Sequence, residues 1–357
     1  MKIISVYAFK KNLALQKPYH IAGHFFEAVE NVFLQITLAN GLMGYGAANP
    51  APEVVGETTS GVLDNLLQRA AALLEGQDIR DFQTLIGHCH TAFPAQPGTQ
   101  ACIDIALHDA FGKFMNMSVV DLYGRQHTKM ATSVTIGITD LASTLEEAAA
   151  YQSMGFRLLK LKTGRDAGED LEKIVRIKEQ FGQHLTLRAD ANMGYSPDQL
   201  RWFMDRAMPY IELLEQPLLP QSESALAAFT AEERTLLVAD ESLKTAEDAI
   251  RLSAEKYYGV FNIKLMKCGG ILPALALAAI ARPGGTRLFW GCNDESCISI
   301  AAALHAAFAC EHTRYLDLDG SLELAEDVAS GGFRLEDGYL YTAGGPGLGL
   351  VDTAHAP

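Results

Sequence analysis

The chain has 357 residues and a formal net charge of −14, and 48% of its residues are hydrophobic. This composition supports a large buried core and excludes an intrinsically disordered chain, while the acidic balance argues against nucleic acid or an anionic membrane as a partner. Charged or polar residues interrupt every apolar stretch before membrane-spanning length. The six cysteines form no C-x-x-C pair and no leader-like segment opens the chain, so we expect reduced thiols and a cytoplasmic protein.

Residues 1–125 are expected to form a small α+β domain. Apolar positions alternate over residues 32–38, and Asn40-Gly41 is a preferred two-residue hairpin turn. Residues 18–26 lie between two predicted strands and form a loop-like stretch rich in aromatic residues and histidine. Such a loop is unusually apolar for a surface, which indicates packing against something else, with a bound ligand as one candidate.

In residues 126–320, short apolar runs alternate with helical patterns, which is typical of a parallel barrel built from βα units. Eight runs are strand candidates, and eight strands close such a barrel. After residue 320 the chain becomes glycine-rich, and we expect residues 321–357 to fold back over the first domain. The strand candidates are residues 132–137, 158–162, 186–190, 211–215, 236–240, 259–264, 287–291 and 315–317.

Acidic residues end three of these strands at equal spacing. Asp190, Glu215 and Asp240 follow one another at steps of 25 residues. Because the carboxyl ends of parallel strands meet at one rim of a barrel, the three carboxylates are expected to converge there. They would repel one another unless a cation lay among them. A set of carboxylates without cysteine or histidine is a hard oxygen site, so we predict Mg²⁺.

Lysines end two other strands. Lys160 and Lys162 point to one face of the second strand because side chains alternate, and Lys264 ends the sixth strand. Strands two and six lie opposite each other in an eight-stranded barrel, so a substrate held by the metal would meet an amine on each of two faces. Lysine normally has a pKa of about 10.4, and nearby cations lower it, which would let Lys162 act as a base beside Lys160 and the metal.

Five motifs occur in order along these strands. They are Lys160-x-Lys162, Asp190-x-Asn192, Glu215-Gln-Pro217, Ala239-Asp-Glu-Ser242 and Asn262-Ile-Lys264. Together they resemble the muconate-lactonizing subgroup of the enolase superfamily over the whole chain, and that superfamily uses a lysine or histidine base with Mg²⁺. The resemblance implies an α/β fold: a modified (β/α)₇β TIM-type barrel under an N-terminal α+β capping domain. It also implies that Lys162 and Lys264 are the acid/base pair and that Lys160 assists them.

The end of the eighth strand narrows the resemblance to one group of enzymes within this subgroup. Asp317-Leu-Asp319 is similar to the Asp-x-Asp of dipeptide epimerases, where the pair holds the N-terminal ammonium of the substrate. Two neighbouring carboxylates need a cation, and an α-amino group supplies one. A turn-forming aspartate before Gly320 is the alternative interpretation. Thr135, on the first strand, is expected to line the same substrate site.

Residues 18–26 are expected to be the specificity loop, with Tyr19, His24 and Phe25 against the second side chain of the substrate. Ala-Glu epimerases carry an arginine near the position of His24, and this stretch has none. A buried glutamate would then lack a partner, so we predict a neutral, preferably hydrophobic, second residue. Two further departures from the family pattern are Ala47, where many relatives have glutamate, and Gln216, which replaces the second acid of Glu-Glu-Pro.

The predicted activity is Mg²⁺-dependent inversion of the α-carbon of the second residue of an L-Ala-Xaa-like dipeptide, by two-base proton transfer through an enolate. One alternative is an L-Ala-D/L-Glu epimerase of cell-wall peptide recycling. Another is an o-succinylbenzoate synthase or cycloisomerase, which would have no use for Asp317 and Asp319. A non-catalytic barrel would be expected to have lost a base or a ligand, and none is missing. The family also predicts a homo-oligomer.

Overall fold

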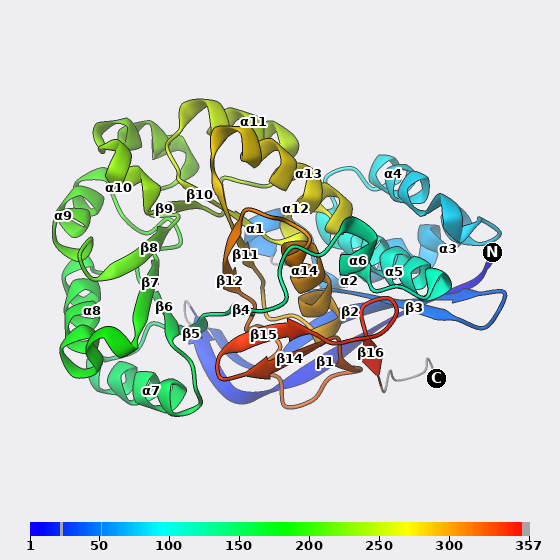
Figure 1. Ribbon diagram of the computed structural model, residues 1–357, viewed down its shortest axis with the longest axis horizontal. Coiled ribbons are helices and arrows are strands. Elements are labelled where there is room, and N and C mark those ends of the chain that lie inside the picture. Colours follow the sequence, from blue (N-terminus) through cyan, green and yellow to red (C-terminus); the bar gives the residue numbers. More distant parts are fainter. Residues whose placement is uncertain (22–23, 51, 352–357) are drawn as a thin grey trace.

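The computed structural model describes the backbone of residues 1–21, 24–50 and 52–351, together with their side chains outside residues 17–26. A parallel sheet curls into a barrel on one side of the molecule, and an antiparallel sheet with its own helices lies on the other (Figure 1). No helix within these ranges is long and apolar enough to cross a membrane.

Eight parallel strands form the barrel in the order of the sequence, each paired with the next. All eight strand candidates are confirmed, and four of them have the predicted limits. The strands are β5 (Val134–Ile136), β6 (Leu158–Lys162), β7 (Thr186–Asp190), β8 (Ile211–Glu215), β9 (Leu237–Ala239), β10 (Val260–Ile263), β11 (Arg287–Gly291) and β12 (Thr313–Asp317).

The first and last strands meet and close the barrel. Thr132 and Leu316 form a parallel bridge just before β5, and the Ser133 amide donates to the Leu316 carbonyl at 3.1 Å. The interior is filled by side chains from several strands, among them Leu213, Val238, Val260, Phe289 and Tyr315. The barrel is therefore a packed core, and chemistry is confined to its ends.

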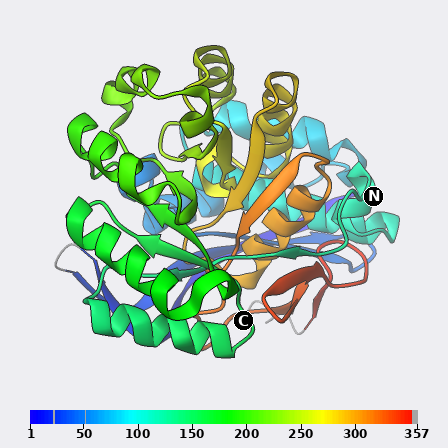
Figure 2. The same cartoon turned by 60° about the vertical axis from the view of Figure 1, so that its left-hand side comes forward.

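Helices follow the strands and cover the outside of the barrel (Figures 1 and 2). Several begin at a side chain that caps them, such as Asp140, Asp166 and Ser196. The last helix is buried along its whole length between the barrel and the N-terminal sheet, as its largely apolar sequence predicts. These helices are α7 (Leu141–Ser153), α8 (Ala167–Phe181), α9 (Pro197–Ala207), α10 (Ala231–Thr235), α11 (Ala246–Glu255), α12 (Leu265–Cys268), α13 (Ile271–Ala281) and α14 (Cys297–Phe308).

The N-terminal sheet consists of β1 (Ile3–Ile21), β2 (His24–Leu38) and β3 (Met43–Ala48), all antiparallel. The prediction of a loop over residues 18–26 is wrong for the described backbone, because Tyr19 pairs with Phe26 and Ile21 with His24. The β-branched and aromatic residues of this stretch suit extended, paired strands. The hairpin therefore extends well beyond the body of the sheet.

Helix α5 (Pro97–Met115) packs closely on the N-terminal sheet. A Cβ atom added to Gly46 would lie 1.9 Å from the carbonyl oxygen of Cys102, so only glycine allows this approach. The helices of this part of the chain are α1 (Pro52–Val55), α2 (Thr59–Asn65), α3 (Ala71–Leu74), α4 (Phe82–Ala92), α5 and α6 (Val119–Tyr123).

The glycine-rich C-terminal part contacts both other parts of the chain. Strand β15 (Tyr339–Thr342) pairs with β14 (Phe333–Glu336) and with β4 (Met130–Ala131), and β13 (Ser330–Gly331) pairs with β16 (Leu350–Val351). The Leu348 amide donates to Oδ1 of Asp109 on α5 at 2.9 Å. The domain limits given above stay a prediction.

Candidate active site

The N-terminal domain covers the carboxyl ends of the barrel strands. Asn49, just after β3, donates from Nδ2 to the Asp294 carbonyl in the loop after β11 at 2.5 Å. The ammonium of Lys244, in the loop after β9, donates to the Val54 carbonyl. Leu15 of β1 forms a bridge with Leu324, a few residues after β12. This domain therefore covers the rim at which the predicted site residues lie.

The three predicted acidic ligands lie on neighbouring strand ends. Asp190 ends β7 and Glu215 ends β8, where the two are directly paired across the sheet, and Asp240 follows β9. All three side chains are buried. The sheet therefore brings together residues that the 25-residue spacing only suggested.

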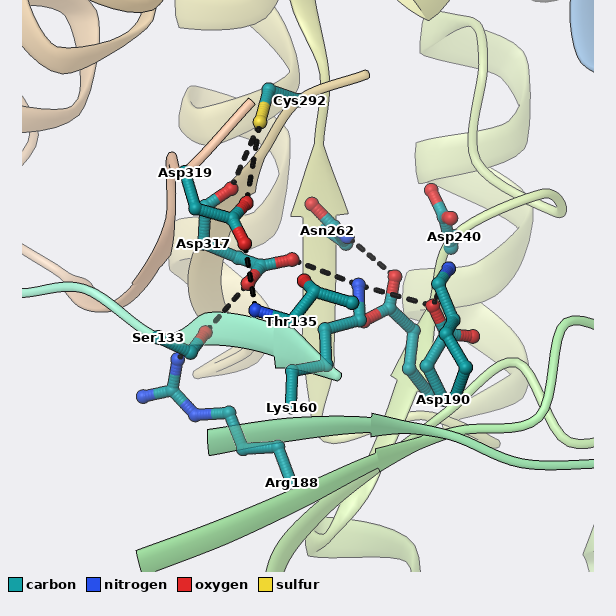
Figure 3. Close-up of polar contacts among 12 residues, drawn as sticks. Ser133, Thr135, Lys160, Arg188, Asp190, Asp240, Asn262, Cys292, Asp317 and Asp319 are labelled. Carbon is teal, nitrogen blue, oxygen red and sulfur yellow. Dashed lines mark hydrogen bonds and ion pairs between the residues drawn. The ribbon is translucent and has the colours of Figure 1, made fainter. Parts of the chain in front are cut away.

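Lysine ammonium groups lie among these carboxylates. Lys160 Nζ is 3.0 Å from Asp190 Oδ2, 3.0 Å from Glu215 Oε2 and 2.8 Å from Asp317 Oδ2 (Figure 3). Lys162 Nζ is 2.8 Å from Asp190 Oδ2, and Lys264 Nζ is 2.9 Å from Asp240 Oδ2. The two predicted bases thus approach the acidic cluster from strands on opposite sides of the barrel.

Charge in this cluster is unevenly compensated. Burial opposes the ionisation of Asp190, but the ammonium groups of Lys160 and Lys162 outweigh it and lower the Asp190 pKa. Burial and the negative charge of Asp190 raise the pKa of Glu215 to about 8. Glu215 therefore lies where additional positive charge would be strongly favoured.

The acidic residues have the donor chemistry of a hard divalent cation site. No three His, Cys, Asp or Glu side chains of the described ranges already converge as a metal site, because ammonium groups separate the carboxylates. The deficit of positive charge at Glu215 is the kind that a divalent cation would remove. The residues present therefore fit such an ion.

The two aspartates after the eighth strand differ in their surroundings. Asp317 is engaged on both oxygens, since Oδ2 binds Lys160 and Oδ1 accepts from Ser133 Oγ at 2.6 Å. Asp319 Oδ2 accepts from the Thr135 amide at 2.8 Å, and among the described residues Asp319 has no ion-pair partner. Burial and the charge of Asp317 raise the pKa of Asp319 to about 7. Of the two aspartates, Asp317 has a cationic partner within the described part of the chain and Asp319 has none.

The substitution at Gln216 has a structural explanation. Its Oε1 accepts from the Asp240 amide at 2.9 Å and the Ser242 amide at 3.2 Å, while its Nε2 donates to the Ser242 hydroxyl at 2.8 Å. Nε2 also donates to the Leu218 carbonyl at 2.9 Å, and a carboxylate could not replace this donor, so the amide is the group that satisfies this site. Gln216 thereby holds the backbone at Asp240.

The side chains of Tyr19, His24 and Phe25 lie outside the described residues, and their predicted contacts with the substrate stay a prediction. Two further residues contact the proposed metal ligands but were given no role in the sequence analysis. Asn262 donates from Nδ2 to Glu215 Oε1 at 2.7 Å, and the buried Lys267 binds Asp240. The signal for Lys267 was a lysine inside an apolar segment, one helical turn after Lys264.

The barrel carries acidic residues at the ends of its third, fourth and fifth strands and lysines at the ends of its second and sixth. An α+β domain covers this rim. Together these features define an enzyme of the enolase-superfamily class. Residues 3–124 match the mandelate racemase / muconate lactonizing enzyme N-terminal domain, and residues 143–353 match the enolase C-terminal domain-like family. The chain belongs to this family.

Similar proteins include the L-Lys-D/L-Arg epimerase of Desulforapulum autotrophicum, 45% identical over 98% of this chain and 99% of the relative. A dipeptide epimerase of Methylococcus capsulatus, solved with Mg and L-Arg-D-Lys, superimposes with a TM-score of 0.95 at 43% identity over 98% of this chain and 100% of that one. One from Enterococcus faecalis V583, solved with Mg and L-Leu-L-Tyr, gives a TM-score of 0.92 at 30% identity over 98% and 99%. Epimerases are isomerases, and the chain is an enzyme of that class.

Proposed function

We propose that the protein is a Mg²⁺-dependent dipeptide epimerase that inverts the α-carbon of the second residue by two-base proton transfer. The observation that carries this proposal is the placement of Lys162 and Lys264. Lys162 ends β6 and Lys264 follows β10, four strands further along the barrel. Each lysine forms an ion pair with a proposed metal ligand. The relatives that are epimerases of dipeptides support the same activity.

Asp190, Glu215 and Asp240 would hold the Mg²⁺ ion. When bound, the ion supplies positive charge that stabilises the negative charge developing on the substrate carboxylate. Lys160 Nζ, between Asp190 and Glu215, adds a fixed ammonium at the same place. Its three carboxylate partners keep it protonated, since they raise its pKa well above the usual value although burial opposes the charge. Lys160 is therefore an electrostatic group and not a base.

The two other lysines move the proton. Neutral Nζ of Lys162 or of Lys264 accepts the α-proton from one face, and the electron pair of the broken C–H bond moves to the carboxylate as an enolate. The ammonium of the opposite lysine then donates a proton to the other face, and the electron pair returns to form the new C–H bond. Each lysine thus serves one stereoisomer.

Asp319 is the proposed receptor for the N-terminal ammonium of the dipeptide. It is the aspartate of the pair without a cation, and its buried carboxylate next to Asp317 favours a positively charged partner. Asp317, bound to Lys160 and Ser133, would act on the substrate only through Lys160. This refines the expectation that both aspartates hold the ammonium.

For the side chains of the dipeptide, we infer a preference for cationic residues. The segment that follows β12 and runs beside β1 carries Glu323 after Asp319, whereas Glu326 is paired with Lys11 and Asp327 accepts hydrogen bonds at the start of α14. Burial and the negative charges of Glu323, Glu147 and Asp319 together raise the pKa of Tyr151, so acids gather on this side of the rim. Relatives at 45% and 44% identity are named for lysine and arginine dipeptides.

The hydrophobic preference predicted above is the second candidate. A relative at 32% identity is named a hydrophobic dipeptide epimerase, and the aromatic residues of the hairpin are compatible with that preference. Glutamate is less favoured as the second residue, because its γ-carboxylate would enter an acidic rim.

The test is incubation with Mg²⁺ in D₂O of four dipeptides: L-Lys-L-Arg, L-Arg-L-Lys, L-Leu-L-Tyr and L-Ala-L-Glu. A gain of about one dalton, the mass difference between deuterium and the hydrogen it replaces, identifies substrates, and kcat/KM ranks them. We expect the cationic pair to rank first. A higher kcat/KM for L-Leu-L-Tyr would favour the hydrophobic candidate, and loss of water without exchange would contradict epimerisation.

A further inference from the structure

Lys267 is a buried lysine that the proposed proton transfer does not use. It lies on α12, the one-turn helix that follows Lys264, and its side chain is only 2% exposed. The ammonium donates to the Asp240 carbonyl at 2.5 Å, to the Asn262 carbonyl at 3.1 Å and to Oδ1 of Asp240. An ammonium has three N–H donors, so no donor is left for a substrate.

Different lysines bind the two carboxylate oxygens of Asp240. Oδ1 is bound by Lys267, and Oδ2 lies 2.9 Å from Nζ of Lys264. Lys264 has to give up this contact in order to exchange protons with a substrate, whereas Lys267 does not. The Asp240 carboxylate therefore keeps one fixed partner whatever its second oxygen binds.

We propose that Lys267 is a positioning residue, which keeps Asp240 oriented as a magnesium ligand while Lys264 acts as an acid and base. The inference rests on the proposed role of Asp240. Lys267 also acts on a second proposed ligand, Glu215, through Asn262. Its ammonium binds the Asn262 carbonyl and so fixes the end of β10, from which the Asn262 side chain donates to Glu215 at 2.7 Å. One ammonium thus connects the ends of β9 and β10.

Removing Lys267 has two opposite consequences for Mg²⁺ affinity. Loss of a nearby positive charge would tighten binding by reducing repulsion of the ion. Loss of the donor would remove one hydrogen bond each from two backbone carbonyls and a carboxylate oxygen and would let Asp240 turn. We expect the second effect to dominate, because partners that orient metal ligands typically contribute about 10- to 100-fold to metal affinity.

The experiment is isothermal titration of Mg²⁺ into the substrate-free protein, comparing wild type, Lys267→Met and the matched control Lys178→Met. Lys178, on α8, also donates to a backbone carbonyl, that of Leu185 at 2.6 Å, but is not part of the site. We expect the Kd to rise at least about tenfold for Lys267→Met and to stay unchanged for Lys178→Met. An unchanged or lower Kd for Lys267→Met would overturn the proposal.

Lys267→Arg tests the same point if Lys267→Met does not fold. A planar guanidinium keeps the charge but cannot place three donors as a compact ammonium does, so Mg²⁺ should again bind more weakly. A wild-type Kd for this variant would mean that charge alone matters and would refute the positioning role.

Three further measurements separate this inference from the proposals on which it rests. Asp240→Asn has to weaken Mg²⁺ binding strongly; a wild-type Kd in this variant would mean that the ligand assignment fails. Adding Lys267→Met to Asp240→Asn should then weaken the residual binding no further, since coupled residues are not additive. At saturating Mg²⁺, Lys267→Met should slow deuterium exchange of both stereoisomers equally, whereas loss of exchange for one isomer alone would make Lys267 a base.

Discussion

Lys160 and Asp317 form a buried ion pair that joins the second and last strands of the barrel. The Lys160 nitrogen lies 2.8 Å from Asp317 Oδ2, although 157 residues separate the two in sequence. Asp317 also accepts from Ser133, which in turn accepts from Arg188 Nη1 at 3.1 Å (Figure 3). This connected network distinguishes Asp317 from Asp319.

Substitution of Asp319 and substitution of Asp317 should therefore affect kinetics and stability differently. Asp319→Asn should raise KM for the dipeptide at least about tenfold, the typical effect of losing a charge-assisted contact, with little change in thermal stability. Asp317→Asn should lower kcat and stability together. The stability loss should be about 2 kcal/mol, below the roughly 3–5 kcal/mol of breaking an isolated buried pair, because Lys160 keeps Asp190 and Glu215.

Steady-state kinetics and thermal unfolding check this pair of variants. Asp205→Asn, at an exposed position on α9, is the control for a charge change without a site effect. Equal loss of affinity in the Asp317 and Asp319 variants, with unchanged stability in both, would show that both aspartates bind the ammonium directly.

The two lysines should be separable by isotope exchange. Lys162→Ala should lose exchange of the α-proton for one stereoisomer and keep it for the other, and Lys264→Ala should show the reverse pattern. Both variants should lose epimerisation, because the return proton has no donor. The measurement is deuterium incorporation into separate L,L and L,D dipeptides, and net interconversion by either single variant would refute the two-base mechanism.

Each proposed metal ligand should be required for Mg²⁺ binding. Asp190→Asn, Glu215→Gln and Asp240→Asn each remove one negative charge from an oxygen site and should weaken Mg²⁺ binding and abolish turnover. Calorimetric titration of Mg²⁺ and activity over a range of Mg²⁺ concentrations test this. Near-normal turnover at ordinary Mg²⁺ in any one variant would remove that residue from the ligand set.

His305 should make the folded state sensitive to acid. It is fully buried on α14, its Nδ1 accepts from the Val120 amide at 3.0 Å, and burial, together with the charge of Arg125, lowers its pKa to about 4. The unfolded chain takes up this proton near pH 6.5 and the folded protein only near pH 4. Stability should therefore fall as the pH is lowered through this window, by at most about 3 kcal/mol from this group.

Urea unfolding between pH 7 and pH 4 measures this effect. His305→Asn offers an acceptor near the position of Nδ1 but does not titrate, so its stability should be lower at pH 7 and should change less with pH. A wild-type slope in this variant would show that other groups cause the acid sensitivity.

The sequence alone determined the strands and helices of the barrel and pointed to the proposed catalytic groups. Strands and helices of the barrel follow from the local alternation of apolar runs, and steps of 25 residues placed Asp190, Glu215 and Asp240 on corresponding strand ends. Both signals depend on residues close in sequence, where the periods of a strand and of a helix are strict. The prediction of a loop over residues 18–26 was wrong because the composition of this stretch is compatible with a strand as well as a loop, and only its pairing partner decides between them.

Only the tertiary structure decided which charged side chains pair with one another. Closure of the barrel brings Asp317 to Lys160 and leaves Asp319 beside the Thr135 amide, although the two aspartates are equivalent in the motif. The turn after Lys264 returns Lys267 to Asp240, and the amide of Gln216 bonds across to Ser242. These pairings depend on distances between strand ends far apart in sequence. In a buried site, where an unpaired charge is costly, such distances determine the role of each residue.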